Sequence, residues 1–144
     1  MQGNPQQHMA LLLGGKPPAP DNVIESFPFA TGGTMSDVGN LTLARSDISG
    51  ESSQDYGYTS GGGPGPAPWK DRIDRFSFAS GGDATDVGNL SHARSGWCGA
   101  NSSTYGYHGG GWDGSPTNII DRWLFASATT DAGNVGDLIA INVQ

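Results

Sequence analysis

Oxygen-bearing side chains gather in a glycine-rich stretch near the C-terminus, TTDAGNVGD at 129–137. Asp131, Asn134 and Asp137 offer the carboxylate and amide oxygens that Ca²⁺ accepts in proteins. The spacing differs from an EF-hand loop, in which ligands alternate and a glutamate closes the site. Aspartate and asparagine also form tight turns without an ion, because their side chains bond to their own backbone. We expect a plain turn here, with a calcium loop as the alternative.

Two further aspartates stand in a repeated motif, DVGN. Asp37 and Asp86 each precede a glycine by two residues. An aspartate in this position accepts a hydrogen bond from the N–H two residues on, which forms an Asx turn. We therefore expect both residues to form Asx turns that start the last strand of each repeat.

Arginines recur at fixed places in a chain that has only seven Lys and Arg residues. Arg45 and Arg94 occupy one repeated position, and Arg75 and Arg122 another. A guanidinium satisfies several acceptors at once through its planar fork of donors. We expect these arginines to bond to backbone carbonyls or to an aspartate between adjacent repeats. The alternative is a ring of anion ligands in a central channel.

Two tryptophans lie in the longest expected loops, where rigid scaffolds often carry binding residues. These are Trp69 and Trp112, with His108 and Asp113 beside the latter. Aromatic rings with neighbouring polar groups suit the apolar faces and hydroxyls of a sugar. These four residues form our candidate glycan site. The alternative is that the tryptophans fold back over the edges of the sheets.

Catalytic and cofactor motifs are missing from the sequence. His8, His92 and His108 stand alone at unrelated positions, and the chain contains neither Gly-x-Ser-x-Gly nor a phosphate-binding loop. No spacing among the 14 acidic residues selects a carboxylate pair for glycoside hydrolysis. We expect no enzymatic activity, no cofactor and no metal.

Composition narrows the class of protein. The 144 residues include 24 glycines, carry a formal net charge of −7 and scatter their basic residues singly, which argues against binding to nucleic acid or an anionic membrane. The single cysteine, Cys98, excludes an intrachain disulfide and is expected to be a small structural side chain; Trp97 beside it is expected in the core. The apolar run at 9–13 is too short for a signal sequence or a membrane span. The sequence thus predicts a soluble protein without membrane insertion.

One sequence pattern is written three times. Phe27 and Phe76 are 49 residues apart, as are Arg45 and Arg94, whereas Phe78 and Phe125 are 47 apart. The repeats run over approximately 8–50, 51–99 and 100–144 within a single domain, 1–144. Periods of this length are typical of propeller blades and related arrays.

Each unit is expected to hold about four short strands and no helix. Alternating aromatic and small residues predict strands that end at glycine doublets. The segments expected as strands in the second unit are 55–62, 73–80 and 85–90, and a fourth segment follows the arginine, at 46–53 after Arg45 and at 95–103 after Arg94. The repeated doublets are Gly14 with Gly15, Gly61 with Gly62, and Gly110 with Gly111. The fold class predicted is all-β, a propeller of three four-stranded blades per chain.

These motifs resemble the kelch-like β-propeller repeat family. The residues that carry the resemblance are an aromatic strand running into a glycine doublet, then an Asp-Arg-aromatic strand, then an Ala-Arg-Ser segment at 44–46 and 93–95. The amino-acid sequence of the repeat is also similar to repeats in proteins of tailed phages of aquatic bacteria. The resemblance implies a structural or host-attachment component of a virion, with other virion proteins and surface glycans as partners. The unit lacks the usual tryptophan after the Asp-Arg strand.

Three repeats are too few to close a ring, since propellers close with about four to eight blades. Two chains joined head to tail would make six. The first repeat lacks its fourth segment, and LIAINVQ at 138–144 alternates apolar and polar residues. We expect a homodimer or higher homo-oligomer, in which this tail either supplies a strand to the first blade of the partner or finishes its own blade.

Overall fold

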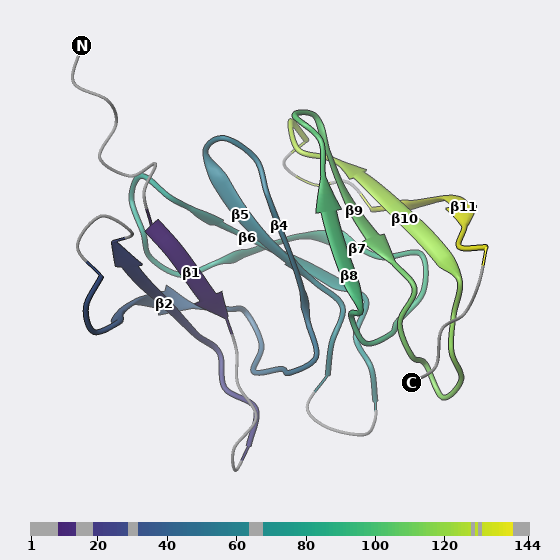
Figure 1. Ribbon diagram of the computed structural model, residues 1–144, viewed down its shortest axis with the longest axis horizontal. Helices are drawn as coiled ribbons and strands as arrows, with labels where there is room; N and C mark the ends of the chain where they lie inside the picture. The colour runs from purple at the N-terminus through teal and green to yellow at the C-terminus, as the bar shows by residue number, and fades with distance from the viewer. Residues whose placement is uncertain are drawn as a thin grey trace.

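The computed structural model describes residues 9–13, 19–28, 32–63, 68–127, 129 and 131–139. Throughout these ranges the regular structure is β-strand, and no helix occurs in them. The strands form three antiparallel sheets that lie side by side in chain order (Figure 1). The all-β prediction is confirmed.

Each sheet is built from strands that follow one another in the chain, and each strand is hydrogen-bonded to the strand beside it in the same sheet. Sheet I contains β1 (Met9–Leu13), β2 (Val23–Pro28) and β3 (Ser36–Asn40). Sheet II contains β4 (Ser49–Ser52), β5 (Tyr56–Ser60), β6 (Arg72–Ser77) and β7 (Thr85–Asn89). Sheet III contains β8 (Cys98–Asn101), β9 (Tyr105–Gly109), β10 (Ile119–Leu124) and β11 (Gly133–Asp137).

The three sheets share one irregularity at the same place. The pairing of the last two strands shifts register after Ile24 in sheet I, after Ile73 in sheet II and after Ile120 in sheet III. A β-bulge twists the strand and re-aims the side chain that follows it. The repeat is therefore structural as well as sequential, and the residue after each isoleucine holds an equivalent place.

The glycine doublets end their strands through left-handed backbone. Gly61 and Gly62 have φ angles of 67° and 85°, and Gly110 and Gly111 have 67° and 118°. Residues with a Cβ atom rarely adopt these positive φ angles, which explains why both positions of the doublet are glycine. Gly14 and Gly15 lie outside the described residues.

Sheets II and III meet through their first strands. β4 contacts β8, and the N–H of Gly96 donates to the carbonyl of Asp47 at 2.6 Å. Among the described residues, sheet I has no strand at this position, because β1 is its edge. The tail that was expected to exchange strands lies mostly outside the described part of the chain, which ends at residue 139.

The core consists of two apolar clusters, one in each junction between sheets. The junction of sheets I and II buries Ile24, Leu41, Phe76 and Ala84, with Val38, Ile48 and Phe78 packed against them. The junction of sheets II and III buries Tyr58, Ile73, Val87, Leu90, Trp123, Phe125 and Ala132. Stability thus resides between sheets, since each sheet buries its apolar face only against the next.

One prediction about the core is wrong. Trp97 was expected in the core but is 45% exposed, and Cys98 beside it is exposed as well. Trp97 lies with Leu138 against Gly110, on the side of sheet III that no other described sheet covers. A strand pattern indicates which side chains share a face, but not whether another sheet covers that face.

In the described ranges, no helix is long and apolar enough to cross a membrane.

Candidate functional site

A buried arginine joins sheet I to sheet II. Arg45, in the segment between β3 and β4, donates from Nη2 to Asp74 Oδ2 on β6 at 2.8 Å, and neither side chain is exposed. The N–H and hydroxyl of Thr42 donate to the same carboxylate at 3.1 and 2.6 Å. Nη1 of Arg45 donates to the carbonyl of Gly61 at 2.6 Å. Burial lowers the pKa of Arg45, and the charge of Asp74 opposes this effect.

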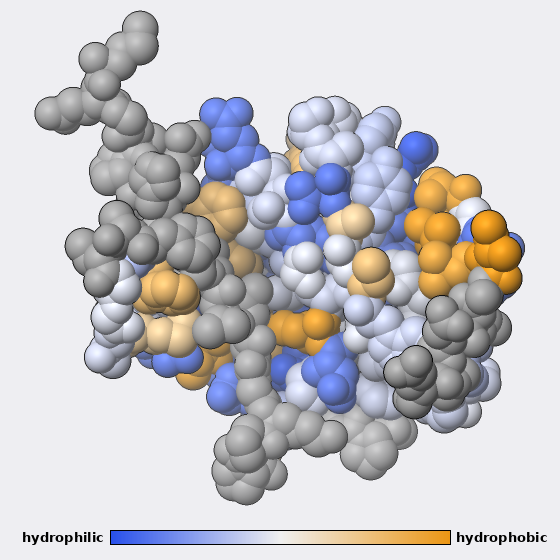
Figure 2. All heavy atoms as spheres, viewed as in Figure 1, coloured by the Kyte–Doolittle hydropathy of each residue, from blue (hydrophilic) through white to orange (hydrophobic). Residues whose placement is uncertain are grey.

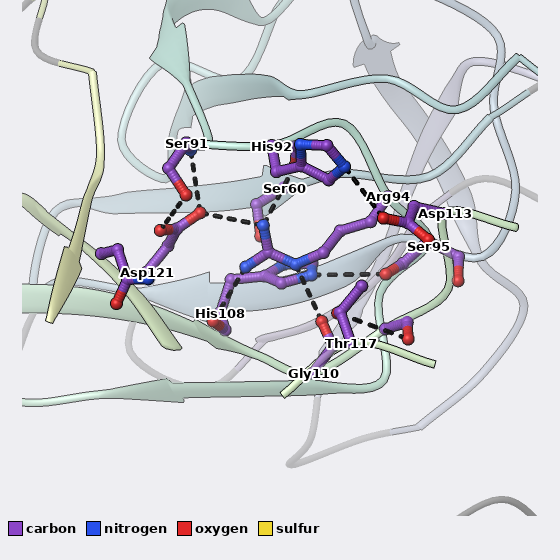
Figure 3. A network of polar contacts seen from close by, with 12 residues as sticks. Ser60, Ser91, His92, Arg94, Ser95, His108, Gly110, Asp113, Thr117 and Asp121 are labelled. Atoms are coloured by element: carbon purple, nitrogen blue, oxygen red, sulfur yellow. Dashed lines mark hydrogen bonds and ion pairs between the residues drawn. The ribbon is translucent and has the colours of Figure 1, made fainter. Parts of the chain in front are cut away.

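A second buried arginine repeats the arrangement between sheets II and III (Figure 3). Nη1 of Arg94 donates to Asp121 Oδ2 at 2.9 Å, again with no exposed surface on either side chain. Ser91 donates its N–H and hydroxyl to this carboxylate at 2.9 and 2.6 Å. The remaining guanidinium donors reach the carbonyls of Gly110 at 2.8 Å and His108 at 3.3 Å.

We call Arg45, Asp74 and Thr42 the first arginine clasp. Arg94, Asp121 and Ser91 form the second arginine clasp. The prediction that Arg45 and Arg94 bond to carbonyls and to an aspartate is confirmed. Both guanidiniums are enclosed by protein, so the alternative of a channel lined with anion ligands is wrong for them. Sequence reasoning did not single out the partner carboxylates, although the repeated Ile-Asp-Arg at 73–75 and 120–122 carried the signal.

A second polar contact recurs at the edge of each junction. Asn40 donates its backbone N–H and its side-chain amide to Asp83 Oδ1 at 2.9 and 3.0 Å. Asn89 makes the same pair of bonds to Asp131 Oδ1, at 2.9 and 3.1 Å. Asp131 was one of three residues considered as calcium ligands, and its place is explained by this contact between sheets.

Turns account for the other residues of the motif. The N–H of Gly39 donates to Asp37 Oδ1 at 3.1 Å, and the N–H of Gly88 donates to Asp86 Oδ1 at 3.2 Å. The expected Asx turns are therefore confirmed. Asn134 accepts the equivalent bond at 2.9 Å from the N–H two residues on. The described ranges hold no group of three or more His, Cys, Asp or Glu side chains placed to bind a metal ion.

A buried chain of polar groups crosses the junction of sheets II and III. The hydroxyl of Ser60 lies 3.1 Å from Glu51 Oε1 and 2.8 Å from His108 Nδ1. His108 Nε2 lies 3.4 Å from the carbonyl of Ser95. A neutral imidazole that donates from Nε2 must accept at Nδ1. Ser60 then donates to His108, and the carboxyl of Glu51 lies within hydrogen-bond distance of the same hydroxyl.

Burial favours the neutral forms that this chain needs. Desolvation raises the pKa of Glu51 well above its usual value. Desolvation, together with the positive charge of Arg94, lowers the pKa of His108 to about 4. At neutral pH His108 is uncharged, and burial favours the protonated form of Glu51, because a charge in this place would lose its hydration without a direct ionic partner.

His108 consequently leaves the candidate glycan site. It was expected near the surface beside Trp112, but its side chain is fully buried and turned toward Ser60 (Figure 3). Ser60 and His108 have the residue types of a nucleophile and its base. Neither has any exposed surface, so a substrate has no access to them.

The surface near Trp112 keeps the other members of the site. The side chain of Trp112 is 37% exposed, and the backbone N–H of Trp112 donates to Ser95 Oγ at 3.0 Å. Asp113 pairs with His92 at 2.9 Å, and a hydrogen bond from the N–H of Ser115 lowers the pKa of Asp113. Sequence reasoning treated His92 as an isolated histidine and missed this pair.

The other predicted site residue stands apart from this cluster. Trp69 is half-buried, and its ring lies close to Gly63 at the start of its own loop.

Comparison with known proteins adds no relative. No protein-family model matches the chain, and a search of curated proteins finds no significant match.

Proposed function

We propose that this chain is a non-enzymatic subunit of a closed homo-oligomeric ring, in which its three sheets are three blades of a kelch-like β-propeller. In this proposal the ring is a structural or host-attachment component of a phage particle. The assignment to a phage rests on the sequence resemblance, whereas the ring rests on the junctions.

The observation that carries the ring is the repetition of one junction. Sheets I and II, and sheets II and III, are joined by the same clasp and the same aspartate–asparagine contact. A repeated contact between identical units generates either a closed ring or an open helix. Three units are fewer than a propeller needs, so in this proposal a second copy of the chain supplies the further units.

A buried ionic clasp also suits a structural role. Its arginine and aspartate side chains have no exposed surface and are paired with each other within the protein. Breaking such a pair leaves a buried charge without a partner, which is costly. The clasps therefore fix the geometry of the junctions and leave no reactive group exposed.

The first experiment is the mass of the purified protein in solution, by light scattering coupled to size exclusion. The chain has a mass of 14.9 kDa, so a six-bladed ring of two copies has a mass of about 30 kDa. A monomer across the micromolar range would refute the homo-oligomeric ring. Labelling of purified virions by antibodies against the chain tests the phage assignment separately.

A second candidate function is carbohydrate binding at the loop of Trp112. Its support is the exposed indole beside an aspartate whose carboxylate is held in place by His92 and Ser115. The test is a broad glycan array with the wild type, Trp112→Ala and, as the control, Trp97→Ala. Binding lost only in Trp112→Ala would support this function, and silence of the wild type would leave the purely structural role.

A further inference from the structure

The two junctions define two kinds of sheet face. The face that sheet I turns toward sheet II carries Val38 and Leu41, and they pack near Phe76 and Ala84 of sheet II. We call the first kind the forward face and the second kind the rear face.

The next junction repeats these faces in the same register. Val87 and Leu90 form the forward face of sheet II, and they pack near Trp123 and Ala132 on the rear face of sheet III. Strand pairing confirms the equivalence, because Asn40 and Asn89 hold the same position opposite the second-last strand of their sheets. Each forward face is therefore covered by an aromatic residue and a small residue of the following sheet.

Within the part of the chain that the structure describes, the forward face of sheet III has no such cover. Val135 and Leu138 occupy the places of Val87 and Leu90, yet they are 47% and 37% exposed, against 5% and 4% for their equivalents. Ile139 beside them is fully exposed. Figure 2 shows the hydrophobic patch at the end of the molecule where β11 lies in Figure 1. Contiguous exposed apolar side chains mark interaction sites.

The rear face of sheet I carries the side chains that would complete this patch. The repeat of 49 residues places Phe27 where Phe76 stands, and Met35 where Ala84 stands. An aromatic residue with an apolar neighbour thus recurs on the rear face of sheet I, which no other sheet of the described ranges precedes. The two ends of the chain have the residue types of the two sides of one junction.

The polar rim of the two end faces is complementary as well. Asp137 pairs opposite Ile119 just as Asn89 pairs opposite Arg72, so Asp137 replaces the asparagine. Thr34 replaces Asp83 in the repeat. Donor and acceptor have therefore changed sides: a threonine hydroxyl faces a carboxylate where an amide faced a carboxylate before.

We propose that the forward face of sheet III docks on the rear face of sheet I of a second copy of this chain. The contact is head to tail and joins Val135, Leu138 and Ile139 to Phe27 and Met35 of the other copy. This inference rests on the proposed ring and names its closing surfaces. Ile139 stands where Thr42 and Ser91 donate to a clasp aspartate, so the closing junction is more apolar than the internal ones.

Complementation between two blocked variants tests the proposal. Leu138→Asp places a charge on the forward face, and Met35→Asp places one on the rear face. Each variant alone is expected to have the mass of a monomer in light scattering. Their equimolar mixture is expected to form a dimer, because one junction between an intact forward face and an intact rear face remains.

Controls separate loss of docking from loss of folding. Ile139→Asp is a second forward-face variant at a side chain that makes no burial in the single chain, so it can block docking without disturbing the core. Trp112 has the same 37% exposure as Leu138 but lies outside both faces. The Trp112→Asp variant should therefore keep the mass of the wild type. Circular dichroism verifies that each variant is folded.

The outcomes distinguish this inference from the proposed ring. A monomeric wild type would overturn the ring and this inference together. An oligomeric wild type whose mass survives both Leu138→Asp and Ile139→Asp would overturn only the docking faces. An oligomer lost in the forward-face variants but kept in Met35→Asp would mean that sheet III docks on itself, which also overturns the head-to-tail contact.

Discussion

Replacing Arg94 by methionine should cost about 3–5 kcal/mol of unfolding free energy, the usual cost of breaking a buried ion pair from one side. Arg94 is fully enclosed, and its loss leaves the carboxylate of Asp121 with only its bonds from Ser91. It also removes the donor to the carbonyl of Gly110. Because a domain of this size has about 5–15 kcal/mol in total, the variant should lose a large share of its stability.

The chain supplies a matched control in a second arginine–aspartate pair. Arg72 and Asp86 lie 3.4 Å apart with 36% and 42% of their side chains exposed. Water screens such a pair, so Arg72→Met should cost less than about 1 kcal/mol. The Arg72–Asp86 contact is also longer than the 2.9 Å between Arg94 and Asp121, and both differences predict a smaller loss.

Urea unfolding followed by circular dichroism measures both free energies. The double variant Arg94→Met with Asp121→Asn removes the buried charge and keeps an acceptor for Ser91. It should therefore be more stable than Arg94→Met alone by at least about 1 kcal/mol, as a coupling within one buried network requires. If Arg94→Met costs no more than Arg72→Met, the clasp does not hold sheets II and III together, and the reasoning is refuted.

Three further predictions concern the same junction. Glu51→Gln keeps a polar partner for Ser60, so its stability should match that of the wild type near pH 4 and exceed it at pH 8. The reason is that a carboxyl whose pKa is raised in the folded state costs about 1.4 kcal/mol of stability for each pH unit between its unfolded and folded pKa values. Equal melting temperatures of the two proteins at pH 8 would contradict this. Because the pKa of His108 is lowered from 6.5 to about 4, the free energy of unfolding should fall by roughly 3 kcal/mol as the pH drops across that interval. In His108→Gln, the urea midpoint should change less over the same pH interval. Gly106→Ala should cost about 1–3 kcal/mol because its Cβ would overlap the Trp123 indole, whereas Gly109→Ala on the same strand meets only ordinary contacts; equal midpoints for the two would contradict the overlap.

The strands and their ends were predictable from sequence, because the signals that specify them act over a few residues. Alternation of apolar and polar side chains marks a strand face, and the doublets at Gly61 and Gly110 mark where positive φ ends a strand. The Asx turns at Asp37 and Asp86 are equally local, since each carboxylate bonds only two residues away. Because the motif is repeated, the same prediction of strands and turns applied to all three sheets.

The junctions were only half predictable. A repeated arginine in a chain with few cations indicated a buried bond, but the partner of Arg94 is 27 residues away and that of Arg45 is 29 residues away. Only the packing of one sheet on the next brings these groups together. Nothing within a few residues of Arg94 marks Asp121 as its acceptor.

Burial was the quantity that the sequence did not determine. The same strand pattern places His108 and Trp97 near sheet III, yet His108 is enclosed by sheet II while Trp97 faces outward. A side chain is buried only when a second surface covers it, and that surface comes from another part of the fold. The sequence therefore determined the repeated unit and its local turns, and the tertiary structure decided which polar groups each junction encloses and which apolar side chains it leaves uncovered.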